Sequence, residues 1–352
     1  MSSNMISFDN IQQAQARIKP FIHQTPIFSS ALLNTWLGHD IFFKAECLQK
    51  VGAFKARGGC NAVAALVEQG QKNPALKPRH IVANSSGNHA QAVAWSAQQF
   101  NIPATIYMPS NVSKVKAQAT KSYGAEIILA DQRAEVDAMV EEASKKAGTF
   151  WIPPYDDDDV IAGQGTVIAE ALTQPVSSDS TNQNNQPHYD AIFAPCGGGG
   201  LISGSFIASR QLSPTTQVIG VEPASGNDAS RSRQTGTILR LADTPATLAD
   251  GARTLSISAR TFHFIKQLDG FFEVEEAAIL YWSQWLAHLL KLRIEPTSAM
   301  TMDGVMQWLN IQPATTRKTI LVVLSGGNID QQTSQLIWQQ NHLSTLPAEK
   351  YS

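Results

Sequence analysis

The sequence predicts an α/β protein built on parallel sheets, with helices covering both faces of each sheet. Two observations support this prediction. Short apolar runs alternate with longer segments of helical periodicity through most of the 352 residues. Three of these runs end in loops rich in glycine and serine, at the strand ends where open α/β sheets bind ligands.

The expected elements follow from the apolar runs and the helical periodicity. Strands are expected at residues 40–44, 80–83, 104–108, 126–130, 191–194, 217–221 and 319–324. Helices are expected at residues 10–19, 56–68, 88–99, 114–123, 134–147, 202–209, 277–292 and 300–309. This alternation favours parallel pairing, because a chain that returns to the same end of a sheet needs a crossover segment.

One segment departs from the alternation. Apart from its two prolines, residues 174–187 contain a single apolar side chain, so this segment cannot cover a core. We interpret residues 174–187 as a flexible surface insertion. It is not expected to be a domain boundary, because the apolar run at 191–194 continues the α/β pattern.

Composition excludes several classes of function. The net charge is −2 and no long basic run occurs, which argues against nucleic acid and anionic membranes as partners. No apolar stretch is long enough to span a bilayer, and the first residues lack the pattern of a secretory signal. Cys47, Cys60 and Cys196 lack metal-ligand spacing, so free thiols are expected. A cytoplasmic protein is therefore expected.

Residues 44–59 carry the most informative lysine. Lys55 directly follows Phe54, on a turn that opens an expected helix. Burial lowers the pKa of a lysine amine, and the neutral amine can attack a carbonyl to form a Schiff base. Most lysines are solvated surface groups, so this segment by itself leaves both interpretations open.

Four consecutive glycines follow the apolar run at 191–194 and precede an expected helix. They are Gly197, Gly198, Gly199 and Gly200. Glycines leave backbone N–H groups accessible and allow positive φ, and the helix start adds the positive end of its dipole. These features predict a phosphate site, with a flexible turn without a ligand as the alternative. The pattern is neither G-x-G-x-x-G nor a P-loop, which disfavours dinucleotides and ATP.

Two further loops follow expected strands. Residues 84–91 place two serines, a glycine and an asparagine at a helix start, which suits a carboxylate or a phenolic oxygen. The same residue types are also ordinary helix caps, and this alternative stays open. Residues 324–330 read Leu-Ser-Gly-Gly-Asn-Ile-Asp. Because parallel strands end at one edge of a sheet, we expect the three loops to converge near Lys55.

Six motifs in order resemble the fold-type II pyridoxal-phosphate enzymes, most closely the serine/threonine dehydratase and serine racemase group. They are Gly-Ala-Phe-Lys55-Ala-Arg-Gly, Ser-Ser86-Gly-Asn88-His-Ala, Val160-Ile-Ala-Gly-Gln-Gly-Thr166, the glycine run, Ile294-Glu-Pro-Thr297 and Ser325-Gly-Gly-Asn. The resemblance is colinear over nearly the whole chain. It implies a two-domain fold of the tryptophan synthase β-like kind. The large cofactor-binding domain would span residues 1–78 and 154–352, with a small substrate domain at residues 79–153.

The resemblance implies a role for each motif. Lys55 would form the Schiff base with pyridoxal 5′-phosphate beside Phe54, and Ser325 would meet the pyridine nitrogen. The glycine run would bind the phosphate, and Asn88 would contact the phenolic oxygen. The residues implied to receive the substrate carboxylate are Ser85, Ser86, Gly87, Asn88 and His89. Ser86 also matches the residue that, in racemases of this group, faces Cα opposite the lysine.

Residues 222–228 resemble the divalent-cation loop of the same group. The implied ligands of Mg²⁺ or Ca²⁺ are the carboxylates of Glu222 and Asp228 and the backbone carbonyl of Gly226. A polar turn after a strand is the alternative interpretation.

Two positions depart from the pattern of the group. Asp137 stands where racemases often carry an arginine, with Arg133 close by in the sequence. Tyr155 stands where some relatives have asparagine. Both positions lie where substrate selection is expected, so the resemblance leaves the substrate open.

The resemblance implies an ammonia-lyase that converts a β-hydroxy amino acid to a 2-oxo acid and ammonia. L-serine, L-threonine and 3-hydroxyaspartate remain possible substrates. The first alternative is an amino-acid racemase with lyase side activity, because Lys55 and Ser86 serve both reactions. A non-catalytic protein that binds the cofactor or an amino acid is the alternative of another class. The resemblance also implies a homodimer.

Overall fold

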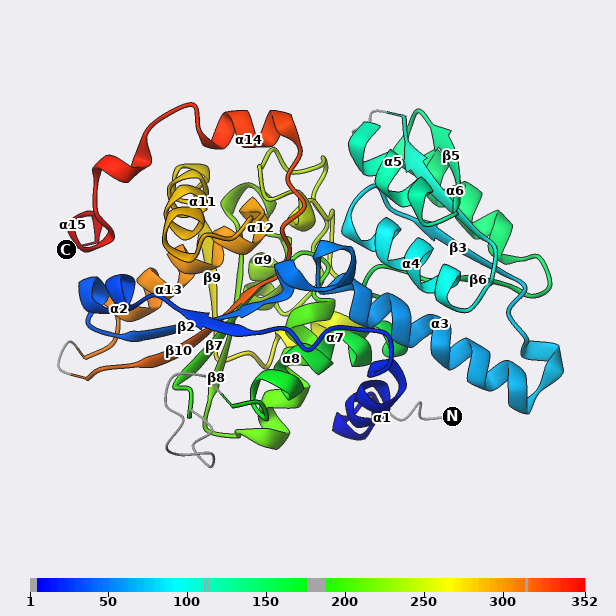
Figure 1. The fold of residues 1–352 in the computed structure, drawn as a ribbon, viewed down its shortest axis with the longest axis horizontal. Helices are drawn as coiled ribbons and strands as arrows, with labels where there is room; N and C mark the ends of the chain where they lie inside the picture. The colour runs from blue at the N-terminus through cyan, green and yellow to red at the C-terminus, as the bar shows by residue number, and fades with distance from the viewer. Residues whose placement is uncertain (1–4, 111, 113, 176–187, 314–315, 352) are drawn as a thin grey trace.

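The computed structural model describes residues 5–110, 112, 114–175, 188–313 and 316–351, and its strands form two sheets (Figure 1). The larger sheet has six strands in the order β1-β2-β10-β7-β8-β9, and the smaller has four in the order β5-β4-β3-β6. Every neighbouring pair is parallel except β1 with β2. The predicted α/β fold with parallel sheets is confirmed.

The strands of the larger sheet come from both ends of the chain, whereas the smaller sheet is built from one continuous stretch. The larger sheet contains β1 (Ile27–Ser29), β2 (Asp40–Ala45), β7 (Ala191–Pro195), β8 (Gln217–Pro223), β9 (Gly270–Val274) and β10 (Thr319–Leu324). The smaller sheet contains β3 (His80–Asn84), β4 (Ala104–Pro109), β5 (Glu126–Ala130) and β6 (Thr149–Trp151).

Helices surround both sheets. In chain order they are α1 (Phe8–Ile18), α2 (Ala31–Leu37), α3 (Lys55–Lys72), α4 (Asn88–Gln99), α5 (Lys114–Ser122), α6 (Arg133–Ser144), α7 (Asp158–Ala171), α8 (Gly200–Leu212), α9 (Asp228–Thr235), α10 (Ala259–Ile265), α11 (Glu276–Leu290), α12 (Pro296–Ala299), α13 (Thr301–Asn310), α14 (Gln331–Ile337) and α15 (Pro347–Lys350). In Figure 1, α3 runs from the larger sheet toward the smaller one.

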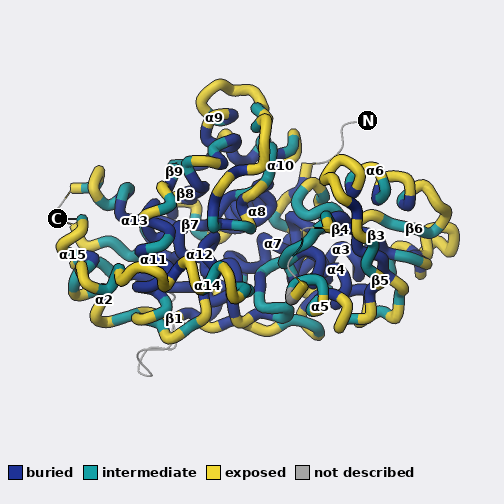
Figure 2. Tube along the Cα trace, turned by 90° about the horizontal axis from the view of Figure 1, so that it is seen from above, coloured by how far each residue is buried: buried dark blue, intermediate teal, exposed yellow. Residues whose placement is uncertain are grey.

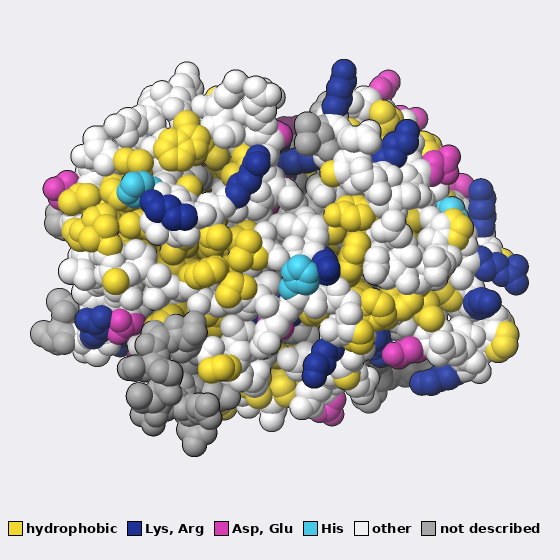
Figure 3. Space-filling view, viewed as in Figure 1, with side chains coloured by type: hydrophobic (Ala, Val, Ile, Leu, Met, Phe, Trp, Pro, Cys, Tyr) yellow, Lys and Arg dark blue, Asp and Glu magenta, His cyan; other side chains and the backbone are white. Residues whose placement is uncertain are grey.

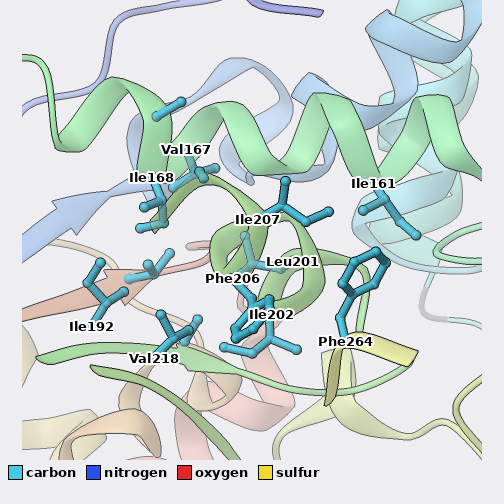
Figure 4. Close-up of a cluster of buried hydrophobic side chains, with 14 of the residues drawn as sticks. Ile161, Val167, Ile168, Ile192, Leu201, Ile202, Phe206, Ile207, Val218 and Phe264 are labelled. Carbon is cyan, nitrogen blue, oxygen red and sulfur yellow. The ribbon is translucent and has the colours of Figure 1, made fainter. Parts of the chain in front are cut away.

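The central strands of the larger sheet are buried on both faces, which explains their continuous apolar sequences. On one face, Ile192 and Val218 pack with side chains of α7 and α8, including Val167 and Phe206 (Figure 4). The opposite face packs against α11 and α13. Figure 2 shows this buried centre as dark blue, with exposed segments around it.

The smaller sheet also has a core on each of its faces. One core joins Ile81 and Ile106 to α3 and α4 through Val63 and Val93. The other core joins Val82 to α6 through Val140. The lysine-bearing helix α3 shares this core with the smaller sheet and also packs against α7, which covers the larger sheet, so its position couples the two.

Several elements were not expected from the sequence. β1, β6 and β9 are edge strands of three to five residues, too short to show a clear alternation. Residue Gln174 was assigned to the flexible surface insertion, but its side chain is buried and accepts a hydrogen bond from Lys44 Nζ at 2.8 Å. Residues 176–187 lie outside the described residues. Across the described ranges, no helix has the length and apolar character needed to cross a membrane.

Candidate active site

Lys55 is the first residue of α3, and its amine reaches the segment that connects β6 to α7. Nζ donates a hydrogen bond to the backbone carbonyl of Pro154 at 2.7 Å and lies 5.1 Å from the centre of the Phe54 ring. Although the residue as a whole is half-buried, protein atoms surround its amine, and this burial lowers the pKa of Lys55 to about 8. A substantial fraction of the amine is therefore neutral near physiological pH, as a nucleophile or base requires.

A buried charge cluster holds the first turn of α3. Arg57 donates to Glu46 from Nε and Nη2, both at 2.8 Å, and to Glu170 at 2.8 Å. Lys44 Nζ also donates to Glu170, at 2.5 Å. Two cations thus balance two anions, and removing one of them would leave an unpaired buried charge. The cluster links α3 to β2 and α7, which fixes the position from which the Lys55 side chain projects.

The segment around Ser325 lies directly beside the Lys55 segment. Phe54 N donates to Ser325 O at 2.9 Å, and Gly327 N donates to Gly52 O at 2.9 Å. An isolated antiparallel bridge joins Ala53 and Gly326. The loop after β10 and the turn before α3 are thus joined by hydrogen bonds. This contact agrees with the expectation that the loop after β10 lies near Lys55.

The buried carboxyl of Glu295 connects Asn88 and Ser325. Asn88 Nδ2 donates to the two oxygens of Glu295 at 3.0 and 3.3 Å, and Ser325 Oγ donates to Oε1 at 3.4 Å. Burial, reinforced by the charge of Asp250, raises the pKa of Glu295 to about 7. Asn328 Nδ2 donates to Asn88 Oδ1 at 2.8 Å, so the orientation of the Asn88 amide is determined from both ends.

The glycine run forms a tight loop between β7 and α8. Gly199 has φ of 89°, in the left-handed region, and Gly200 is the first residue of α8. A Cβ on Gly197 would lie 2.6 Å from Gly251 O, and one on Gly198 would lie 2.0 Å from the Tyr155 ring. The loop therefore has no room for side chains, and it combines bare backbone with a helix N-terminus.

The loop between β3 and α4 carries the remaining predicted substrate contacts. Ser85 Oγ accepts a hydrogen bond from Gly87 N at 3.3 Å, and within the described part of the chain Ser86 Oγ has no hydrogen-bond partner. The ring of His89 faces the end of β6 and donates from Nε2 to Ile152 O at 2.8 Å. Burial and the nearby Lys55 lower the pKa of His89 to about 3, so this ring is neutral.

The two residues that depart from the group's pattern have different surroundings. Asp137 accepts hydrogen bonds from Asn84 Nδ2 at 2.6 Å and Arg133 Nε at 3.1 Å. Asn84 is the last residue of β3, directly before the serine loop, so Asp137 supports the start of that loop. Tyr155 lies against Gly198 and donates from its hydroxyl to Ser256 O at 3.0 Å.

Glu222 lies near the carboxyl end of β8 and Asp228 is the first residue of α9, and both are buried. Glu222 accepts hydrogen bonds from Ser230 N at 2.7 Å and Ala229 N at 3.3 Å. Asp228 accepts from Ile257 N at 2.8 Å through Oδ2, while Oδ1 has no partner among the described residues. Burial raises the pKa of Asp228 to about 6 and that of Glu222 well above its usual value.

Comparison with known proteins identifies the family to which this chain belongs. Residues 18–326 match the family described as pyridoxal-phosphate dependent enzyme. The chain belongs to this family. It is 39% identical to L-threo-3-hydroxyaspartate ammonia-lyase from Saccharomyces cerevisiae over 92% of this chain and 94% of that protein. It is 37% identical to serine racemase from Schizosaccharomyces pombe over 94% of this chain and 97% of that protein.

A solved structure supports the same conclusion. The crystal structure of threonine deaminase from T.th. superposes with a TM-score of 0.82 and 39% identity, over 92% of this chain and 99% of that chain. The fold-type II architecture and the use of pyridoxal phosphate, both predicted from the motifs, are confirmed. The chain is an enzyme, which excludes the non-catalytic alternative.

The residues at the site of this pyridoxal-phosphate-dependent enzyme fit its cofactor. Lys55 offers a partly neutral amine to the aldehyde. The glycine loop, where any Cβ would collide with its neighbours, offers backbone to the phosphate. The amide of Asn88 would donate an N–H to the phenolic oxygen, and the hydroxyl of Ser325 is a neutral partner for the ring nitrogen. The individual roles of these residues stay predictions.

Three groups at the site received no role from the sequence. Glu295 and Asn328 belong to motifs that carried the resemblance, so their presence in those motifs was the available signal. No sequence signal pointed to the carbonyl of Pro154, because every residue type carries a backbone carbonyl. All three became visible only as contacts between segments far apart in the chain, such as Asn88 and Glu295, which are 207 positions apart.

Gly198→Ala is expected to weaken pyridoxal phosphate binding at least about tenfold, because its Cβ would overlap the Tyr155 ring and displace the loop. Titration of the cofactor-free protein, followed by absorbance, measures this change. Gly270→Ala in β9 is the matched control, since its Cβ would meet its neighbours at ordinary contact distances of 3.4 Å or more. Equal affinities in the two variants would show that the glycine loop does not bind the cofactor.

Proposed function

We propose that this enzyme is an ammonia-lyase that removes the β-hydroxyl group of an amino acid and releases a 2-oxo acid and ammonia. The observation that carries the proposal is that the buried Lys55 amine, whose pKa is about 8, and the neutral hydroxyl of Ser325 lie on two segments that are hydrogen-bonded to each other. The relatives named ammonia-lyase and threonine deaminase support it. A panel of L-serine, L-threonine and the isomers of 3-hydroxyaspartate, with detection of both 2-oxo acid and ammonia, tests it.

Each proposed step assigns a proton to a named atom. Pyridoxal phosphate supplies an aldehyde for the substrate amine and a ring that withdraws electrons from Cα. Lys55 Nζ, once it no longer holds the aldehyde, takes the proton from Cα. The β-hydroxyl leaves as water after gaining a proton, with Ser86 or the cofactor phosphate as donor. Hydrolysis of the dehydrated product returns one water and gives the 2-oxo acid and ammonia.

The partner of the ring nitrogen favours elimination. A serine hydroxyl cannot stabilise a full positive charge on that nitrogen as a carboxylate would. Ser325 Oγ is itself engaged with Ser298 Oγ at 2.9 Å and with Glu295. We propose that the ring stays close to neutral, so that negative charge on Cα is short-lived and the β-hydroxyl leaves promptly.

Racemisation is the second candidate function, and the free hydroxyl of Ser86 favours it. Ser86 Oγ, unpartnered among the described residues, can deliver a proton to the face of Cα opposite Lys55. The relative named serine racemase supports this alternative. Chiral analysis of the products from L-serine separates the two functions: abundant D-serine with little pyruvate would contradict the lyase proposal.

The substrate is proposed only as a class. Asp137 accepts hydrogen bonds from Asn84 and Arg133, so it supports the start of the serine loop, while 47% of its side chain stays exposed. The relative named L-threo-3-hydroxyaspartate ammonia-lyase adds 3-hydroxyaspartate to serine and threonine as a candidate. The substrate panel ranks the three.

We propose a divalent cation, Mg²⁺ or Ca²⁺, at Glu222, the Gly226 carbonyl and Asp228. The unpartnered Oδ1 of Asp228 and the burial of both carboxylates support the proposal. Within the described ranges, no group of three or more His, Cys, Asp or Glu side chains could hold a metal, so the carbonyl and water would complete the shell.

Removal of the cation is expected to lower the melting temperature by about 5 °C, because a ligand that binds only the folded state stabilises it. EDTA should produce this shift in the wild-type enzyme and reduce its activity, and added Mg²⁺ or Ca²⁺ should reverse both. Glu222→Gln should be insensitive to EDTA. If the chelator leaves wild-type activity and melting temperature unchanged, residues 222–228 are an ordinary turn.

The domain organisation and the assembly are also proposals. Residues 79–153 would form the small domain, which the smaller sheet between β3 and β6 supports. Free buried thiols at Cys47, Cys60 and Cys196 support a cytoplasmic location. Hydrophobic patches on the face in Figure 3, between α11 and β2, support a homodimer.

A further inference from the structure

The acceptor of the Lys55 amine lies on a connecting segment between the two sheets. Pro154 follows β6 of the smaller sheet and precedes α7, which packs on the larger sheet. Its carbonyl accepts the 2.7 Å hydrogen bond from Lys55 Nζ and a longer one, 3.4 Å, from Gln164 Nε2. Among the described residues it is the one hydrogen-bond acceptor of the Lys55 amine.

Tyr155, the next residue, holds this segment against two loops beside the larger sheet, which contain Gly198 and Ser256. Its hydroxyl donates to Ser256 O at 3.0 Å, and its ring covers Gly198 so closely that a Cβ there would overlap it. Asp157 then caps α7 by accepting a hydrogen bond from Val160 N at 2.8 Å. The position of the Pro154 carbonyl is thus set by the side chains that follow it in this segment.

We propose that the Pro154 carbonyl, held in place by Tyr155, is the docking point of the Lys55 amine whenever that amine is not bonded to the cofactor. Tyr155 is then a positioning residue that acts through the backbone of Pro154. The inference rests on the proposed function, in which the released Lys55 amine is the base at Cα.

A single backbone acceptor is suited to orienting a base. A neutral lysine amine carries two N–H groups and one lone pair. A hydrogen bond from one N–H to the Pro154 carbonyl directs the lone pair away from that carbonyl. When the amine takes a proton, the same carbonyl stabilises the ammonium by a charge-assisted hydrogen bond. The carbonyl therefore orients the base before proton transfer and stabilises its conjugate acid afterwards.

Tyr155→Phe tests the inference, because it keeps the ring over Gly198 and removes only the bond to Ser256. Tyr281→Phe is the matched control: it also deletes a bond from a tyrosine hydroxyl to a backbone carbonyl, Thr345 O at 2.9 Å, but on α11 and away from Lys55. Melting temperatures of both full-length variants establish that they fold.

The first readout is the pH dependence of cofactor loading, measured as the rate at which the cofactor-free protein gains visible absorbance on addition of pyridoxal phosphate. Only the neutral amine reacts, so the wild-type rate should rise through a midpoint near pH 8, the pKa of Lys55. In Tyr155→Phe the ammonium loses a well-placed acceptor, so the midpoint should fall by about one pH unit. The midpoint of Tyr281→Phe should match the wild type.

The second readout is turnover of the loaded enzyme. We expect kcat of Tyr155→Phe to fall about tenfold with little change in KM, because the misplaced amine affects proton transfer more than substrate binding. An unchanged loading midpoint together with unchanged kcat in Tyr155→Phe would overturn the inference, as would equal changes in Tyr281→Phe. Lys55→Ala separates the two proposals: if it retains turnover, the proposed function fails; if it is inactive while Tyr155→Phe behaves as wild type, only the docking inference fails.

Discussion

Replacing Lys55 with alanine should reduce turnover of every β-hydroxy amino acid by about 10⁴-fold or more, because in the proposed mechanism one amine both holds the cofactor and takes the α-proton. The visible absorbance of the Lys55-bound cofactor should disappear with it. Absorbance spectroscopy of the purified variant and a coupled assay for the 2-oxo acid measure both effects. The fold should persist, because the Arg57 cluster that anchors α3 is untouched.

Lys145→Ala is the matched control for this experiment. Lys145 is an exposed lysine that pairs with Glu142 at 2.9 Å on the smaller sheet's side of the molecule. Its loss should leave the spectrum and the turnover unchanged. Retention of the wild-type absorbance band in Lys55→Ala would show that another amine holds the cofactor, and the assignment of Lys55 would be wrong.

Ser86→Ala should abolish any formation of D-serine from L-serine, with a loss of about 10³-fold, because no hydroxyl would remain to exchange a proton on the second face of Cα. Elimination from the L substrate should persist at a reduced rate, since Lys55 and the cofactor phosphate remain. Chiral chromatography of the amino acid and a pyruvate assay follow the two products in the same reaction.

Ser96→Ala controls for damage to α4. Ser96 lies on the helix that follows the serine loop, is buried, and donates its hydroxyl to Ala92 O at 2.6 Å, away from that loop. This variant should retain both products. If Ser86→Ala still forms D-serine at the wild-type rate, Ser86 is not the second proton donor, and racemisation must use another group.

The predicted strands and helices agree with the structure wherever a long apolar run or a clear helical period was present. β5 and α4 have the predicted bounds, and β7 and β10 differ by at most one residue. α4, β7 and β10 are largely buried, and burial imposes the apolar pattern on their sequences, whereas β5 is an edge strand that has an apolar run at residues 127–130 although only Ala130 is buried. The short edge strands β1, β6 and β9 carry little burial and therefore little pattern.

The helix α7 contains a motif that the sequence revealed, although its helical structure was not predicted. Its glycines at 163 and 165 lower helix propensity, so the segment does not resemble a helix locally. The structure gives their reason: a Cβ on Gly163 would lie 2.5 Å from Arg57 O, and one on Gly165 would lie 2.9 Å from Gly204 O. Close packing against α3 and α8 decides these residues, and packing between helices is a tertiary property.

By itself the sequence determined the family of this protein and predicted the chemistry of its site: a lysine for an aldehyde, glycines for a phosphate, and a serine loop at a helix start. These predictions follow from the types of residue and from their order along short stretches of the chain, and a motif contains both. Only the tertiary structure decided that Glu295 joins Asn88 to Ser325, and that the Pro154 carbonyl receives the Lys55 amine. Those contacts depend on which strands lie side by side in each sheet and on where the two sheets meet, and they join segments that no local pattern relates.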